Sequence, residues 1–155
     1  MIAAAGVSDR FLFTGFRNDI RRIMLASDVC VLSTHFEGLP LVLIEAMSLG
    51  RACVATAVDG VLETIDDGVT GLVHGNGDAA GLASCLVRFL DNPAFADRIG
   101  EAARAEVRRR FGPERFARDM FDVYAHVTGH GGGGRKAAED TVHVRAEAAG
   151  RSSDA

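Results

Sequence analysis

The fold is decided by the stretch Glu37-Gly38-Leu39-Pro40-Leu41-Val42-Leu43-Ile44-Glu45, which joins a short loop to an apolar helix. Pro40 suits the first turn of a helix and Gly50 is typical of the residue that ends one, so we predict a helix from Pro40 to about Leu49. This helix is apolar on all sides, and we therefore expect it to be buried on most of them. Glu45 is its only charged residue. A lone buried carboxylate is costly unless a basic side chain, backbone donors or ligand hydroxyls pair with it.

Short apolar segments alternate with helical patterns on both sides of this stretch. The predicted strands are 11–14, 28–32, 52–56 and 71–74. The predicted helices begin after a capping Asn18, at Val61 (ending near Asp66), after a capping Asp78, at about Ala94 (ending near Arg110) and at Pro113. The strands lack polar alternation, as expected of strands that are buried on both faces. This order predicts an α/β fold, a Rossmann-like parallel sheet with flanking helices, followed by C-terminal helices.

Composition limits the class of protein. The chain has 155 residues, 48% of them hydrophobic, and a net charge of −4, which does not suggest a nucleic-acid partner. The longest basic run, Arg108–Arg110, lies in a helical pattern and is typical of a solvated face. Three cysteines without metal-ligand or redox spacing favour a reducing, cytoplasmic setting. No signal peptide or membrane span is recognisable. We predict a folded domain over 1–128 and a disordered, low-complexity tail over 129–155.

The loop before the central helix has the chemistry of a binding site. It follows the carboxyl end of a predicted parallel strand, where open α/β sheets bind ligands. The free N–H groups of the helix start suit a diphosphate, and Gly38 lets the backbone approach it closely. Glu37 and Glu45 add two carboxylates, which accept hydrogen bonds from hydroxyl-rich groups. A diphosphate together with hydroxyls describes a nucleotide sugar.

A set of motifs in fixed order carries a resemblance to a known family. The set comprises Phe13-Thr14-Gly15-Phe16, Ala26-Ser27-Asp28-Val29, the stretch from Glu37 to Met47, Gly50-Arg51-Ala52-Cys53-Val54-Ala55-Thr56, Gly60-Val61-Leu62-Glu63-Thr64-Ile65 and Asp67-Gly68-Val69-Thr70-Gly71-Leu72-Val73. Together they resemble the retaining glycosyltransferases of family 4, which have the GT-B fold, over about residues 7–127. The resemblance implies the partial C-terminal, nucleotide-sugar-binding domain of such an enzyme.

The resemblance also implies roles for individual residues. Glu45 would bind the ribose hydroxyls of the donor, and Glu37, as the catalytic residue, would contact the transferred sugar and stabilise the reacting centre. The donor would also be held by backbone N–H groups of Gly38, Leu39, Leu41 and Val42, and its base would be bordered by Gly15, Phe16 and Arg17. The sugar would be transferred with retention of configuration. No metal or other cofactor is expected.

The family pattern is incomplete at the front of the chain. The acceptor-binding first domain is missing, and so is the glycine-rich strand with its Arg and Lys clamp. We therefore expect the last third of a longer enzyme or a truncated product, incomplete for turnover alone, whose partners are a nucleotide sugar and the missing domain. Membrane association would be at most peripheral, at the inner face. The alternatives are a non-catalytic remnant or interaction module, and a GT-B-like nucleotide-sugar epimerase.

Several side chains also have simpler interpretations. Glu37 can be a solvated loop acid, and Glu45 can pair with a structural arginine. Glu63 can be a favourable charge at a helix start rather than a donor contact. His35 can be an exposed loop residue, and Asp28 a turn cap. An apolar stripe on the last helix can be core or domain-packing surface; it consists of Phe116, Met120, Val123, Tyr124 and Val127.

Overall fold

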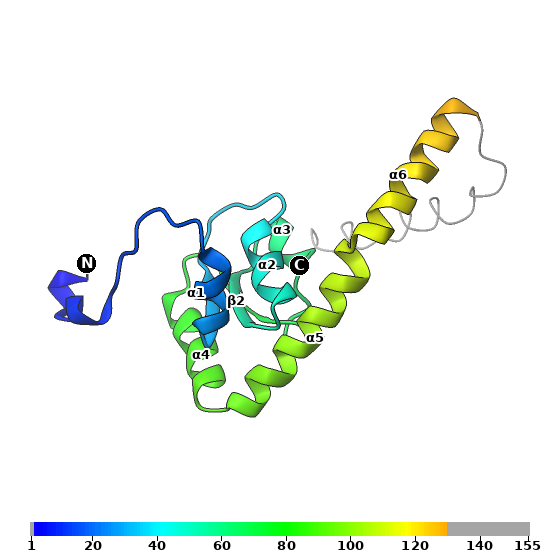
Figure 1. Ribbon diagram of the computed structural model, residues 1–155. Coiled ribbons are helices and arrows are strands. Elements are labelled where there is room, and N and C mark those ends of the chain that lie inside the picture. Colours follow the sequence, from blue (N-terminus) through cyan, green and yellow to red (C-terminus); the bar gives the residue numbers. More distant parts are fainter. Residues whose placement is uncertain (1, 130–155) are drawn as a thin grey trace, which may run out of the picture. The chain divides into compact units, whose positions relative to one another are not determined.

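A small parallel sheet organises the computed structural model, which describes residues 2–129 (Figure 1). Within those residues the sheet has three strands in the order β1–β2–β3. The strands are β1 (Val29–Leu32), β2 (Ala52–Thr56) and β3 (Leu72–His74). Each pair of neighbours is parallel, β1 with β2 from Val29↔Ala52 onward and β2 with β3 from Val54↔Leu72 onward. The predicted α/β class and parallel sheet are confirmed.

Helices precede, connect and follow the strands. They are the short 3-10 helices η1 (Ala3–Ala5) and η2 (Ser8–Arg10), and the α-helices α1 (Ile20–Ala26), α2 (Leu41–Ser48), α3 (Asp59–Leu62), α4 (Ala79–Leu90), α5 (Pro93–Phe111) and α6 (Pro113–Thr128). By its internal contacts the chain divides into two units, residues 1–108 and 109–155. The first unit holds the sheet and its covering helices.

Strand β2 is buried along its whole length because helices cover both faces of the sheet. Its side chains alternate between two apolar layers. Cys53 and Ala55 belong to one layer, and Ala52 and Val54 to the other. The continuous apolar run in the sequence, without polar alternation, thus corresponds to a strand with no solvent-facing side.

The two layers contain different helices. In the first, Leu43, Ala46 and Met47 of α2 pack on the sheet, joined by two residues of α5. In the second, Phe89 of α4 stacks on Phe95 of α5, with ring centroids 5.5 Å apart. Helix α5 leaves α4 by a tight turn and contributes to both layers, as its long course in Figure 1 shows. Helix α2 is thereby fixed from two sides, by the sheet and by α5.

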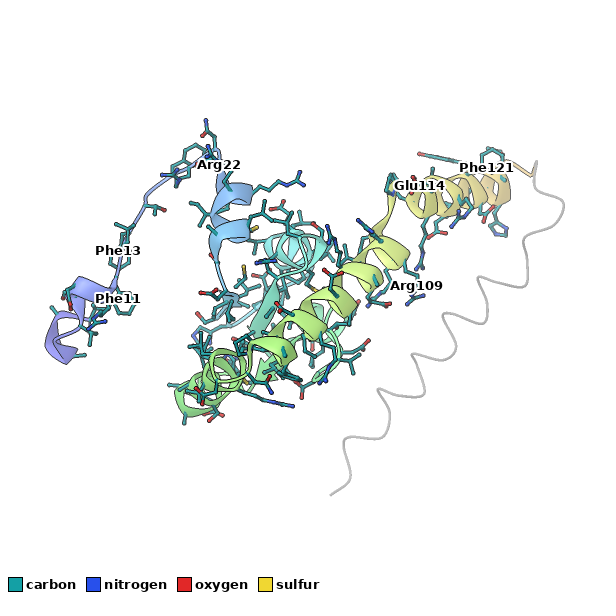
Figure 2. The ribbon with its side chains drawn as sticks, turned by 60° about the horizontal axis from the view of Figure 1, so that its bottom comes forward. Phe11, Phe13, Arg22, Arg109, Glu114 and Phe121 are labelled. Atoms are coloured by element: carbon teal, nitrogen blue, oxygen red, sulfur yellow. The ribbon has the colours of Figure 1, made fainter. Side chains whose placement is uncertain are left out.

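The predicted strand at 11–14 is wrong. These residues form exposed coil ahead of α1, and the side chains of Leu12 and Phe13 are largely in solvent. The rings of Phe11 and Phe13 stack only on each other, 6.4 Å apart (Figure 2). A strand is stabilised by its ladder partners, and no described residue forms a ladder with this segment. A short apolar run in the sequence is therefore not enough to form a strand.

Helix ends agree with the sequence at some positions and not at others. Asp78 caps α4 as predicted, since its Oδ1 accepts the N–H of Gly81 at 2.8 Å. Gly50 follows α2 with φ at 72°, the left-handed conformation expected there. The predicted Asn18 cap is wrong, because Asp19 stands at the cap position of α1 and makes no capping bond. A membrane-crossing helix is absent from residues 2–129, since no helix there combines the length and apolar character required.

The second unit contributes α6 to the described residues. None of the residues of α6 is buried. The predicted apolar stripe is therefore open on this helix, and Phe121, labelled in Figure 2, is also exposed. The predicted disordered tail, 129–155, lies outside the described residues from residue 130 onward.

We expect Phe89→Ala to lower the free energy of unfolding by about 3–5 kcal/mol, because it removes a fully buried ring from the second layer. Leu90→Ala is the matched control, since Leu90 is the next residue on α4 and 60% exposed. Urea denaturation followed by circular dichroism measures both changes. Equal losses for the two variants would contradict this packing.

Candidate functional site

The predicted binding loop lies at the carboxyl edge of the sheet. Strand β1 ends at Leu32, β2 at Thr56 and β3 at His74, and parallel strands place these ends at one edge. The segments that follow them are the loop 33–40, the turn into α3 and the turn 75–78 before α4. The loop 33–40 leads directly into α2.

Two contacts from neighbouring segments hold this loop. The N–H of Gly60 in α3 donates to the carbonyl oxygen of Glu37 at 3.1 Å. His35 Nδ1 lies 2.6 Å from Asn76 Oδ1, in the turn after β3. Within the loop, the Thr34 hydroxyl donates to the carbonyl of Phe36 at 2.9 Å. The loop before α2 is thus tied to the segments that follow both β2 and β3.

The start of α2 presents backbone donors. The carbonyl of Pro40 accepts the N–H groups of Leu43 and Ile44, which closes the first turn. The N–H groups of Gly38, Leu39 and Val42 find no acceptor within residues 2–129. Three of the four predicted backbone donors are therefore available to an anion.

Leu41 departs from this prediction. Its N–H is directed to the carbonyl of Leu39 at 2.9 Å, a tight turn that the sequence gave no reason to expect. Its side chain is 63% exposed, together with that of Val42 at 45%.

The expected burial of Glu45 is wrong. Only one face of α2, with Leu43, Ala46 and Met47, is buried, and Glu45 lies on the exposed opposite side, four residues after Leu41. Among the described residues, α1, the sheet and α5 pack against α2, while the apolar Leu41 and Val42 stay exposed. Glu45 therefore pays no desolvation cost in this chain.

Neither glutamate has a protein partner in the part of the chain that the structure describes. The carboxylates of Glu37, which is half-buried, and of Glu45 make no hydrogen bond or ion pair there. The alternative of a structural arginine for Glu45 is thus not realised within residues 2–129. Both carboxylates are free to accept hydrogen bonds from a ligand.

The predicted base-bordering residues lie in the exposed segment before α1. Gly15 has φ at 62°, and Phe16 is 99% exposed. Arg17 is bound to Asp19 by two hydrogen bonds, of 2.7 and 2.6 Å. Among the described contacts, no hydrogen bond or ion pair joins these residues to 37–45. Their predicted role rests on the resemblance alone.

Other predicted features have simpler outcomes. Glu63 follows α3 instead of opening it, because α3 begins two residues earlier than predicted, at Asp59. Asp28 makes no capping bond to the described residues. Burial raises the thiol pKa of Cys30 and Cys53, which fits small apolar residues of a sheet. Residues 2–129 contain no group of three His, Cys, Asp or Glu side chains placed to hold a metal ion.

Two residues of the site were not predicted from the sequence. Asn76 stands in the turn Gly75-Asn76-Gly77, which signals only a loop after a strand. Gly60 belongs to a quoted motif, but its contact with Glu37 depends on how closely α3 approaches the loop.

Comparison with known proteins places this fold in a family. The family model described as glycosyl transferases group 1 matches residues 1–92. The chain therefore belongs to the group 1 glycosyltransferases. Its fold is that of the C-terminal, Rossmann-like domain of GT-B enzymes, as the resemblance implied.

Individual relatives agree. N-acetyl-alpha-D-glucosaminyl L-malate synthase of Bacillus anthracis is 32% identical over 121 residues, 78% of this chain and 32% of that protein. D-inositol 3-phosphate glycosyltransferase of Streptomyces coelicolor is 41% identical over 100 residues, 64% of this chain and 21% of that protein. The crystal structure of Anabaena HepE in complex with UDP superposes with a TM-score of 0.78 at 26% identity, covering 81% of this chain and 35% of HepE. The chain thus spans between 21% and 35% of the length of these proteins.

We expect Arg17→Ala to raise the pKa of Asp19. The Arg17 hydrogen bonds lower this pKa, so the pair persists above the ordinary carboxyl range and is lost as pH falls through the depressed value. Carbon-13 NMR titration of the Asp19 carboxyl measures the change. Arg21→Ala is the control, because Arg21 is an exposed arginine of α1 and the causes of the Asp19 shift do not include it. An unchanged Asp19 pKa in the Arg17 variant would disprove the pairing.

Proposed function

We propose that residues 33–45 bind the nucleoside-diphosphate-sugar donor of a glycosyltransferase. One observation carries the proposal: free backbone donors at the start of α2 stand beside two unpaired carboxylates at the carboxyl edge of the sheet. A nucleotide sugar needs both kinds of group. Its diphosphate requires donors, and its sugar and ribose hydroxyls require acceptors.

The hydrogen-bond donors of the site lie at the start of α2. The N–H groups of Gly38, Leu39 and Val42 would bond the diphosphate oxygens, and the helix dipole adds about 0.3–1 kcal/mol toward a negative charge. The N–H of Leu41 already donates to the carbonyl of Leu39, so it would not bond the diphosphate. Leu41 would contribute only through its position in the turn.

The hydrogen-bond acceptors of the site are the carboxylates of Glu37 and Glu45. Glu45 would accept hydrogen bonds from the ribose hydroxyls. Glu37, held through its own carbonyl by Gly60, would contact the transferred sugar and stabilise the positive charge that develops at its anomeric carbon. Gly15, Phe16 and Arg17 would border the base once their segment lies beside the donor.

The whole protein's activity is part of the proposal. A sugar would pass from the diphosphate to an acceptor with retention at the anomeric carbon, mainly through positioning and charge stabilisation. The reaction would need no metal and would take place in the cytoplasm, a compartment in which three unpaired thiols are stable. Proton NMR of the product tests retention, and activity in excess EDTA tests metal independence.

We expect Glu45→Gln to weaken binding of UDP by about tenfold or more, because a neutral amide replaces a charged acceptor of ribose hydroxyls. UDP is the first probe because HepE was crystallised with it, and GDP is the second. Isothermal titration calorimetry measures both affinities on the 155-residue chain.

Glu101→Gln is the matched control for this experiment. Glu101 is an exposed glutamate on α5 that pairs only weakly, at 3.4 Å, with Arg104. Its loss should leave nucleotide affinity unchanged. If the native chain is folded and binds neither UDP nor GDP, the proposed function is wrong; if the two variants bind equally well, Glu45 has no ribose role.

A donor-binding module without transfer activity of its own is the second candidate. The open apolar stripe on α6 favours it, because such a surface suits docking onto another protein domain. Sugar transfer by this chain alone, in a turnover assay with UDP-sugars and simple acceptors, would exclude it.

A further inference from the structure

Gly60 occupies a place in which no side chain fits. It is buried in α3, and a Cβ built on it would overlap the carbonyl oxygen of Gly38. The same Cβ would lie 2.5 Å from the carbonyl oxygen of Glu37 and 2.7 Å from the carbonyl carbon of Gly38. All three are backbone atoms, so no side-chain rotation can relieve the overlap.

The need for glycine here is one of space. Gly60 is not among the glycines with positive φ, so other residues could adopt its backbone conformation. The absent Cβ instead lets the binding loop settle directly on α3, where the N–H of Gly60 donates to Glu37 O at 3.1 Å. One residue thus provides both the clearance and the hydrogen bond.

Helix α3 is a firm support for this contact. Val61, the residue after Gly60 in α3, and Ile65, in the segment that follows α3, are buried in the layer that also holds α2. The buried hydroxyl of Thr64 donates to the carbonyl of Gly60 at 2.8 Å. Because α3 is fixed by the core, a larger residue at position 60 would displace the loop more readily than the helix.

We propose that Gly60 is a positioning residue for the donor site: it sets the place of the Glu37 carboxylate and of the free N–H groups at Gly38 and Leu39. The inference rests on the proposed function of this loop. Gly60 itself touches no reacting atom; it acts through the backbone of Glu37 and Gly38. Catalytic and binding groups must be held within about 0.5 Å of their working positions, and the overlap exceeds that tolerance.

The test is Gly60→Ala in the 155-residue chain, with UDP as the probe. We expect UDP affinity to fall by about 10- to 100-fold, as for a misplacement of roughly 1 Å. Nitrogen-15 NMR should also show displaced amide signals for residues 37–42. Titration calorimetry and the NMR spectra are recorded on the same samples.

Gly100→Ala is the matched control. A Cβ at Gly100 would overlap the carbonyl oxygen of Gly50, the same kind of backbone clash, at the contact between α5 and the end of α2. It should cost comparable stability while leaving UDP affinity and the amide signals of 37–42 near their native values. Thr64→Val, which removes only the hydroxyl bond to Gly60, is the milder second variant and should weaken UDP binding in the same direction.

Each outcome decides the inference. Weaker UDP binding and moved loop signals in Gly60→Ala, but not in Gly100→Ala, support it. Native affinity and native loop signals in a folded Gly60→Ala, or equal losses in both alanine variants, overturn it. If Gly60→Ala does not fold, Thr64→Val decides by the same two measurements. If the native chain binds no UDP or GDP, the proposed function fails, and the amide signals alone judge whether Gly60 places the loop.

Discussion

The burial of β2 on both faces is the constraint on which the rest of the structure depends. Its side chains are small, with alanine, cysteine and valine at 52–55, so helices can approach the sheet closely from either side. Helix α2 is pressed onto one face and α4 onto the other, while α5 contributes to both layers. The position of α2, and with it the direction of its N–H groups, follows from packing far from the site.

The two glutamates of the site are held by different means. Glu45 is carried on the second turn of α2, so its place is as fixed as the core residues one and two positions further on, Ala46 and Met47. Glu37 stands in a loop, and its place depends on the hydrogen bond from Gly60 and on the link between His35 and Asn76. A helix and a loop supported at its backbone thereby fix two carboxylates at one edge of the sheet. Loss of the loop supports would affect Glu37 without affecting Glu45.

The sequence predicted what local patterns determine. Strands 28–32, 52–56 and 71–74, the Asp78 cap and the site loop all have signals within a few residues of themselves, and the structure has them at those places within one residue. The prediction of a strand at 11–14 was wrong because strand pairing depends on a partner strand, which the segment itself does not determine. The prediction that Glu45 is buried was wrong because the apolar pattern of a helix does not show how many of its faces are covered. Gly60 was not assigned because a missing Cβ matters only once two segments approach in space.

The exposure of Glu45 changes the physical argument for a ligand. Had it been buried, a partner would have been needed to repay the cost of desolvation, and a nearby arginine would have explained the residue as well as a donor does. In solvent the carboxylate needs no partner for folding, and its helix would be stable without it. Its neighbours Leu41 and Val42 are apolar and also exposed, so this face of α2 is an apolar surface in solvent with a single charge at its centre. A ligand whose hydroxyls reach Glu45 would satisfy this charge, and the ribose of a nucleotide carries such hydroxyls.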